Sequence, residues 1–159
     1  MFLRQTKFLR YNKSMKALIQ RVKNASVTID DKLYSSIGKG LLVFLGVEKT
    51  DEPAALGYIS DKILKLRIFE DEAGKMNFSI KDINGEMLIV SQFTLAGSTK
   101  KGCRPSFDNA MPPEKAKIYY EKFIELCKAS GISVKTGVFG AMMDIGLIND
   151  GPVTFMVEK

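Results

Sequence analysis

The run GLLVFLGV, at residues 40–47, restricts the fold of this chain more than any other feature. A strand built from it has two apolar faces, and such a strand lies in the middle of a sheet that is covered on both sides. The residues TDEP, at 50–53, are a typical helix start. Apolar residues then recur at helical spacing, at Leu56, Ile59, Ile63 and Leu66. A first strand–helix unit is therefore expected here.

A second unit of the same kind follows. The run EMLIVSQFTL, at residues 86–95, is another buried strand by its pattern, and a loop rich in Gly, Ser and Lys comes after it. Pro112-Pro113 opens a second amphipathic helix, for which Gly131 is a suitable C-terminal cap. The whole pattern predicts a single mixed α/β domain, in which strands flank two β-α units and the helices cover one side of a curved sheet.

Alternating residues predict the outer strands. Residues 16–30 read as one long strand, or as two strands with a bend, and KLYSSIGKG continues the sheet. After the second helix, three strands are expected in SVKTGVF, MMDIGLI and PVTFMVE. Asn149-Asp150-Gly151 separates the last two and resembles a tight hairpin turn.

The first 14 residues, MFLRQTKFLRYNKS, differ from the rest of the chain. They contain four basic residues and no acidic one, so they supply +4 of the formal net charge of +6. We expect residues 1–14 to be an extension outside the fold, from an upstream in-frame start, a cloning remnant or a short targeting segment. Residues 15–159 then form one domain that is nearly neutral, and bulk charge says little about RNA binding.

Missing residue types exclude several kinds of active site. The sequence has no histidine, which rules out Ser-His-Asp triads, Cys-His dyads and histidine-based metal sites. Cys103 and Cys127 lack the spacing of a zinc site or a disulfide framework, which favours a reducing, cytoplasmic location. No apolar run approaches the roughly 20 residues of a membrane span. We expect no metal, no cofactor and no membrane; backbone N–H groups, hydroxyls, amides and the substrate itself remain for any chemistry.

Two short motifs stand out. SQFTL, at residues 91–95, ends an apolar strand, where polar groups can face a cleft, although it also fits a strand that turns polar on leaving the core. NDGPVTF, at residues 149–155, fits an edge hairpin whose proline blocks further pairing. Each motif alone has this simple structural explanation.

Together, SQFTL and GPVT resemble the D-aminoacyl-tRNA deacylase family of the bacterial and eukaryotic type. The segments LIQRV, GLLVFLGV, RIFEDEAGKMN, KGCRPSF and TGVFGAMM also look like family segments, so that the resemblance covers residues 15–159. It implies an enzyme that hydrolyses the ester of D-aminoacyl-tRNA, and of glycyl-tRNA mischarged on tRNA-Ala. It further implies a homodimer in which the Gly151–Pro152 bond is cis and enters the partner's pocket.

The resemblance also implies roles for individual residues. The catalytic residues would be Ser91, Gln92, Phe93 and Thr94, with backbone N–H groups near Phe93 and Thr94 as an oxyanion hole. The substrate-binding residues would be Gly151, Pro152, Arg21, Ala141 and Met143. The tRNA-binding residues would be Lys100, Lys101 and Arg104. In this scheme the carbonyl oxygens of Gly151 and Pro152 collide with the side chain of a bound L-amino acid, whereas the side chain of a D-amino acid points away from them.

Some alternatives stay open. Arg21 either braces the Gly-Pro loop or is a solvated arginine on a strand. Lys100, Lys101 and Arg104 bind tRNA phosphates or contact only solvent. Phe139, Ala141 and Met143 form a pocket wall or a dimer core. Thr94 is a nucleophile or, because no base is available, a positioning residue for direct attack by water. A small-ester hydrolase and a non-catalytic nucleic-acid or chaperone-like module are the competing functions.

Overall fold

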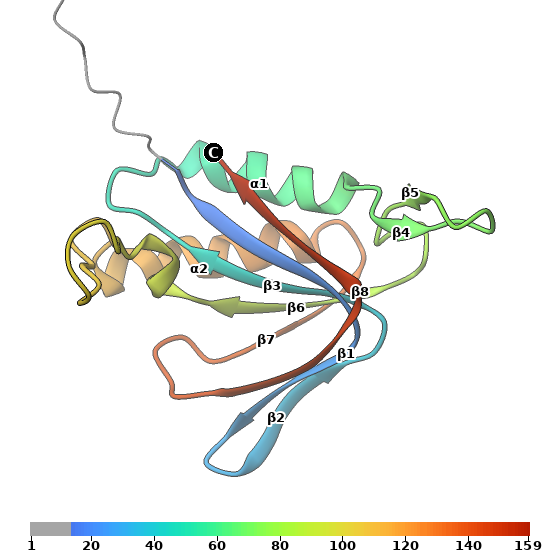
Figure 1. Ribbon diagram of the computed structural model, residues 1–159, viewed down its shortest axis with the longest axis horizontal. Helices are drawn as coiled ribbons and strands as arrows, with labels where there is room; N and C mark the ends of the chain where they lie inside the picture. Colours follow the sequence, from blue (N-terminus) through green and yellow to red (C-terminus); the bar gives the residue numbers. More distant parts are fainter. Residues whose placement is uncertain (1–13) are drawn as a thin grey trace, which may run out of the picture.

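The computed structural model describes residues 14–159 (Figure 1), so residues 1–13 of the expected extension lie outside the described residues. In chain order, the elements are β1 (Lys16–Ile29), β2 (Lys32–Ile37), β3 (Gly40–Gly46), α1 (Pro53–Lys65), β4 (Phe69–Glu70), β5 (Met76–Phe78), β6 (Glu86–Ser91), the 3-10 turn η1 (Phe93–Ala96), α2 (Pro113–Lys128), β7 (Ser133–Thr136) and β8 (Asp144–Glu158). Pro53 and Pro113 begin the two helices of this part of the chain, as predicted. Neither helix is long and apolar enough to span a membrane.

The main sheet is organised around the long strand β1. Its strand order is β2-β1-β3-β6-β7, and β8 pairs with the other edge of β1. The pairs β3–β6 and β6–β7 are parallel, whereas β1 runs antiparallel to all its neighbours. The sheet curls until its ends meet, where the Ser35 hydroxyl on β2 donates to the Thr136 carbonyl on β7 over 2.7 Å. The predicted curved mixed α/β domain is confirmed (Figure 1).

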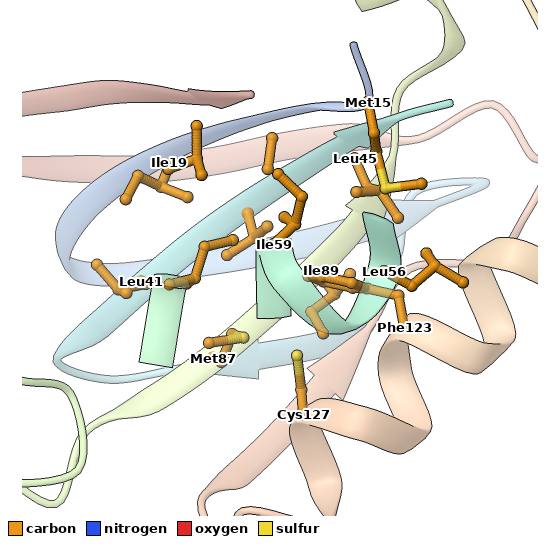
Figure 2. Packing of buried hydrophobic residues seen from close by; sticks show 14 of the residues in the cluster. Met15, Ile19, Leu41, Leu45, Leu56, Ile59, Met87, Ile89, Phe123 and Cys127 are labelled. Atoms are coloured by element: carbon orange, nitrogen blue, oxygen red, sulfur yellow. The ribbon is translucent and has the colours of Figure 1, made fainter. Parts of the chain in front are cut away.

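Both faces of the central strands are buried, as the apolar runs predict. Alternate side chains of β3 and β6 pack beneath α1 and α2 on the outer face of the sheet (Figure 2). This outer core contains Leu41, Val43, Leu45, Met87 and Ile89. The intervening side chains point into the curl, where Leu42, Leu88 and Val90 join a second cluster with Val22 and Val27. Both helices therefore cover the same side, and the strand ends between them are free to form a site.

Two predicted boundaries are wrong. The strand expected over residues 86–95 ends at Ser91, and the chain turns into η1. The two strands expected on either side of Asn149-Asp150-Gly151 are one strand, β8, which pairs with β1 throughout. Asn149 lies opposite Val22 and Thr154 opposite Gln20, so residues 150–153 bulge out of the ladder without reversing it. Local turn residues suit a bulge and a hairpin equally, and the long partner strand decides between them.

Candidate active site

The carboxyl ends of β3 and β6 open into a cavity of about 610 Å³. Parallel neighbours end at the same edge of a sheet, and the loops that follow them form the walls. The cavity brings together five residues predicted for the site: Ser91, Gln92, Phe93, Ala141 and Met143. Its lining residues lie within the described part of the chain, and none of them carries an ionisable side chain. The cavity is therefore a largely apolar pocket with a few polar groups at one end.

The turn η1 forms that polar end. The Gln92 N–H donates to the Leu45 carbonyl over 2.8 Å, which ties the turn to the end of β3. A Cβ on Gly46 would lie 2.7 Å from the Leu95 Cβ, so only glycine allows the turn to pack this closely. Within residues 14–159, the N–H groups of Phe93 and Thr94 have no acceptor. These two donors are the ones expected to form an oxyanion hole.

Thr94 lies on the same turn but is not among the residues that line the cavity. Its side chain is exposed, and the Thr94 hydroxyl oxygen accepts a hydrogen bond from the Gln92 side-chain amide. A hydroxyl that accepts from an amide is not activated as a nucleophile, because it lacks a base to remove its proton. The contact favours the positioning role over the nucleophilic one.

Phe107 lines the cavity beside Phe93 and is missing from the predicted site. Its ring centroid lies 5.2 Å from that of Phe93, and the two rings are tilted by 58°. Both rings remain partly exposed at the cavity mouth, Phe93 by 58% and Phe107 by 41%. The segment after Phe107 is held to β3, since the Met111 N–H donates to the Val47 carbonyl over 3.0 Å. The only signal in the sequence was the segment KGCRPSF, of which Phe107 is the last residue.

The predicted tRNA-binding cations lie at the tip of the loop beside this wall. Ser98 and Ser106 exchange backbone hydrogen bonds of 2.7 and 2.9 Å, which close the loop at its base. Lys100, Lys101 and Arg104 are exposed within it, and none forms an ion pair with another described residue. Three exposed cations without an ion-pair partner among the described residues thus lie in the loop that precedes Phe107.

Ala141 and Met143 lie in the segment that leads into β8. A Cβ on Gly137 would lie 2.6 Å from the Met143 sulfur, and the Val138 N–H donates to the same sulfur over 3.4 Å. The Ala141 N–H donates to the Val138 carbonyl over 3.2 Å, which folds the segment into a tight turn. Met143 also packs against the inner cluster of the sheet. The two residues therefore form a wall of the cavity and present no reactive group.

The remaining predicted site residues form a separate structure at the bulge of β8. Arg21 is only 5% exposed; its Nε donates to the Asp150 carbonyl and its Nη1 to the Ile68 carbonyl, both over 2.8 Å. Arg21 is thus a brace of this loop and not a solvated strand arginine. Gly151 has a φ of +147°, and its bond to Pro152 is cis. We call residues 149–153, which include this bond, the Gly-Pro bulge.

Asn149 closes the Gly-Pro bulge, although it was not among the predicted site residues. Its side-chain oxygen accepts from the Val153 N–H over 2.7 Å, and its amide donates back to the Val153 carbonyl over 3.1 Å. These two bonds replace the ladder contacts that the bulge gives up. The backbone of the bulge is therefore fixed on one side by Asn149 and on the other by Arg21.

The cavity and the Gly-Pro bulge lie at opposite ends of the sheet in one chain. Arg21, which holds the bulge, pairs with Leu41, whereas Ser91 at the cavity pairs with Leu45. These positions on β3 are about 13 Å apart along the strand. In addition, β1 and β3 lie between β8 and β6. The predicted site residues therefore fall into two groups that a single chain does not bring together.

Comparisons with known proteins agree on one family. The family model described as D-Tyr-tRNA(Tyr) deacylase matches residues 18–158. The D-aminoacyl-tRNA deacylase of Thermodesulfovibrio yellowstonii is 54% identical over 144 residues, which cover 91% of this chain and 99% of that protein. The D-aminoacyl-tRNA deacylase of Cytophaga hutchinsonii is 57% identical over 146 residues, with 91% and 97% covered. A solved structure titled "c-Myc DNA Unwinding Element Binding Protein" has a TM-score of 0.86 at 44% identity, covering 91% of this chain and 99% of that one.

Proposed function

Because this chain belongs to the D-Tyr-tRNA(Tyr) deacylase family, we propose that it hydrolyses the ester of D-aminoacyl-tRNA to free tRNA and a D-amino acid. The proposal rests on one observation: the N–H groups of Phe93 and Thr94 have no hydrogen-bond acceptor among the described residues, and they lie beside a cavity without ionisable side chains. We further propose that this proofreading takes place in the cytoplasm. The exposed Lys100, Lys101 and Arg104 would bind phosphates of the tRNA.

The proposed mechanism uses main-chain donors. The ester carbonyl accepts hydrogen bonds from the N–H groups of Phe93 and Thr94, which stabilise the negative charge that develops on its oxygen. Water attacks the carbonyl carbon directly and gives up a proton, the acyl C–O bond to the terminal ribose breaks, and the departing ribose oxygen takes up a proton. The neighbouring ribose hydroxyl of the tRNA relays this proton. The absence of histidine from the sequence, and of ionisable groups from the cavity lining, supports a route in which the substrate supplies this help.

The proposed selectivity depends on a second copy of the chain. The cavity lining contains no charged side chain to bind the substrate ammonium, and the braced Gly-Pro bulge lies far from the cavity of its own chain. In a homodimer, the bulge of one subunit would enter the cavity of the other. Its carbonyl oxygens would accept hydrogen bonds from the substrate ammonium and collide with an L-side chain, while a D-side chain points away. The bracing by Arg21 and Asn149 supports this role, because a steric filter must be rigid.

A panel of substrates tests the proposed function. D-tyrosyl-tRNA and glycyl-tRNA carried on tRNA-Ala are expected to be hydrolysed and L-tyrosyl-tRNA to be spared, because glycine has no side chain to collide with the filter. Release of labelled amino acid is followed for each tRNA and for free D-tyrosine methyl ester. Equal turnover of the free ester and the tRNA ester would instead identify a small-ester hydrolase. Binding of all three tRNAs without turnover would identify a nucleic-acid-binding module, and survival of glycyl-tRNA at high enzyme would refute the steric filter.

A Thr94→Ala variant is expected to keep kcat within about tenfold of wild type, because removal of a nucleophile typically costs a thousandfold or more. The modest loss reflects the Gln92 amide, which loses its acceptor on Thr94. Single-turnover deacylation of D-tyrosyl-tRNA measures the effect. Ser130→Ala is a matched control, because its hydroxyl bonds only the Cys127 carbonyl at the end of α2. A covalent aminoacyl-enzyme trapped on Thr94 of the wild type would contradict the role assigned here.

A further inference from the structure

We propose that Lys16 is a positioning residue for this reaction, which holds η1 in register with the part of the cavity wall that contains Ala110. The inference rests on the proposed deacylation and adds a residue to it. Lys16 is the first residue of β1 and pairs with Gly46, the last residue of β3. Its ammonium group contacts η1, and Lys16 is not among the residues that line the cavity.

The Lys16 ammonium makes two contacts that join different segments. Its Nζ lies 3.5 Å from the Leu95 carbonyl oxygen of η1 and 3.3 Å from the Glu48 carboxylate. The two side chains of the ion pair are 25% and 11% exposed, so the pair is largely shielded from water. A shielded pair of opposite charges holds its geometry better than an exposed pair, because solvent screens it less.

The Leu95 carbonyl is a natural point from which to hold η1. The turn has four residues, and the carbonyls at the end of a helical turn lack intrahelical donors. Leu95 follows Phe93 by only two positions, so a shift of its carbonyl reorients the N–H groups of Phe93 and Thr94. Gly46 sets how closely η1 approaches β3, and the Lys16 contact resists rotation of the turn on that surface.

Glu48 anchors the other end of the contact. Its segment is paired with residues 109–110, since the Lys49 N–H donates to the Asn109 carbonyl over 2.8 Å and Glu48 forms an antiparallel bridge with Ala110. Ala110 lines the cavity. The Glu48 N–H donates to the Asp51 carboxylate over 2.7 Å, which fixes the segment from behind. Lys16 therefore links η1 to the part of the cavity wall that contains Ala110.

A second buried acid supports the need for a cation at this position. Burial raises the pKa of the Asp51 carboxyl to about 6, and the Lys16 ammonium offsets part of this rise. Asp51 is 6% exposed and Glu48 is 8% exposed. Lys16 thus pairs with the shielded Glu48 carboxylate while it donates to η1, and a neutral side chain of similar length does neither.

A Lys16→Met variant is expected to lower kcat for D-tyrosyl-tRNA about tenfold with little change in KM, because misplaced donors weaken the transition state more than the bound substrate. Lys16→Arg, which keeps the charge, should recover most of the rate. Glu48→Gln should lower kcat less, and the double variant should be no slower than Lys16→Met alone, because both changes break one link. Lys65→Met is the control, since it removes an exposed ion pair with Asp61 on α1.

Amide hydrogen exchange provides a readout that does not depend on activity. Exchange at the amides of Leu95 and Gly97, which donate to the Gln92 and Thr94 carbonyls within the turn, should quicken in Lys16→Met relative to Lys65→Met. A Lys16→Met enzyme with wild-type kcat, or with a raised KM alone, would overturn the proposal, as would unchanged exchange at both amides. If Lys16→Met fails to fold, Glu48→Gln gives the same two readouts. An inactive wild type would count against the proposed function instead, while the exchange result would still decide whether Lys16 holds η1.

Discussion

A Gly151→Ala variant is expected to lose deacylase activity by about a hundredfold or more while it stays folded, because a small displacement of a positioning group can cost that much. Gly151 has a φ of +147°, which L-residues rarely adopt. An added Cβ would lie 2.7 Å from the Val153 Cγ2 and 3.2 Å from the Arg21 Nη2. The bulge must therefore move away from its brace, and the carbonyls proposed to surround the substrate α-carbon move with it.

Deacylation of D-tyrosyl-tRNA and thermal unfolding of the same samples measure this effect. Gly57→Ala is the matched control: Gly57 lies within α1, and a Cβ there would meet no atom within 4 Å. That change should raise the free energy of unfolding by about 0.5–1 kcal/mol and leave activity unchanged. A folded Gly151→Ala protein with wild-type kcat and unaltered rejection of L-tyrosyl-tRNA would show that the bulge has no part in the site.

Two inactive variants are expected to restore activity when they share a dimer. Gly151→Ala spoils the bulge and keeps the cavity, whereas Ala141→Trp fills the cavity and keeps the bulge. In a mixed dimer, the intact cavity of one subunit receives the intact bulge of the other. Random mixing makes half of the dimers mixed, each with one complete site, so total activity should reach about a quarter of the wild-type value.

Co-expression of the two variants with different affinity tags allows the mixed dimers to be purified and assayed. Each variant expressed alone is the control and should stay inactive. Mixed dimers without activity would mean that each subunit uses its own bulge, contrary to the separation between the Gly-Pro bulge and the cavity. A monomer with full wild-type activity, detected by light scattering during the assay, would exclude the shared site altogether.

Local pattern was sufficient to predict much of the fold. Residues 40–47 are apolar at successive positions, and β3 is indeed buried on both faces. The prolines at 53 and 113 marked the helix starts, because proline is favoured in the first turn. Ser91, Gln92 and Phe93 were placed at a strand end by the change from apolar to polar residues, and that strand end opens into the cavity. These predictions depend on residues that are close together in the sequence, and local sequence patterns report such relations well.

The rest depends on partners far along the chain. Phe107 meets Phe93 because Ser106 is paired with Ser98 and Met111 is tied back to Val47, and no local pattern reports these ties. The bulge of β8 resembles a hairpin turn until β1 is known to continue past it. The separation of Arg21 from Ser91 likewise follows from their places in the ladder, not from their motifs.

The N–H groups of Phe93 and Thr94 belong to the main chain, and this has an evolutionary consequence. A change of side chain at either position leaves the donor in place, and only proline removes it. Related proteins can therefore differ in sequence around this turn and still keep the two N–H donors. A lineage that abandons the reaction should record its loss first at the glycines that shape the backbone, Gly46 behind the turn and Gly151 in the bulge. Among distant descendants, we expect the presence of glycine at those two positions to distinguish active enzymes from inactive ones better than overall sequence identity does.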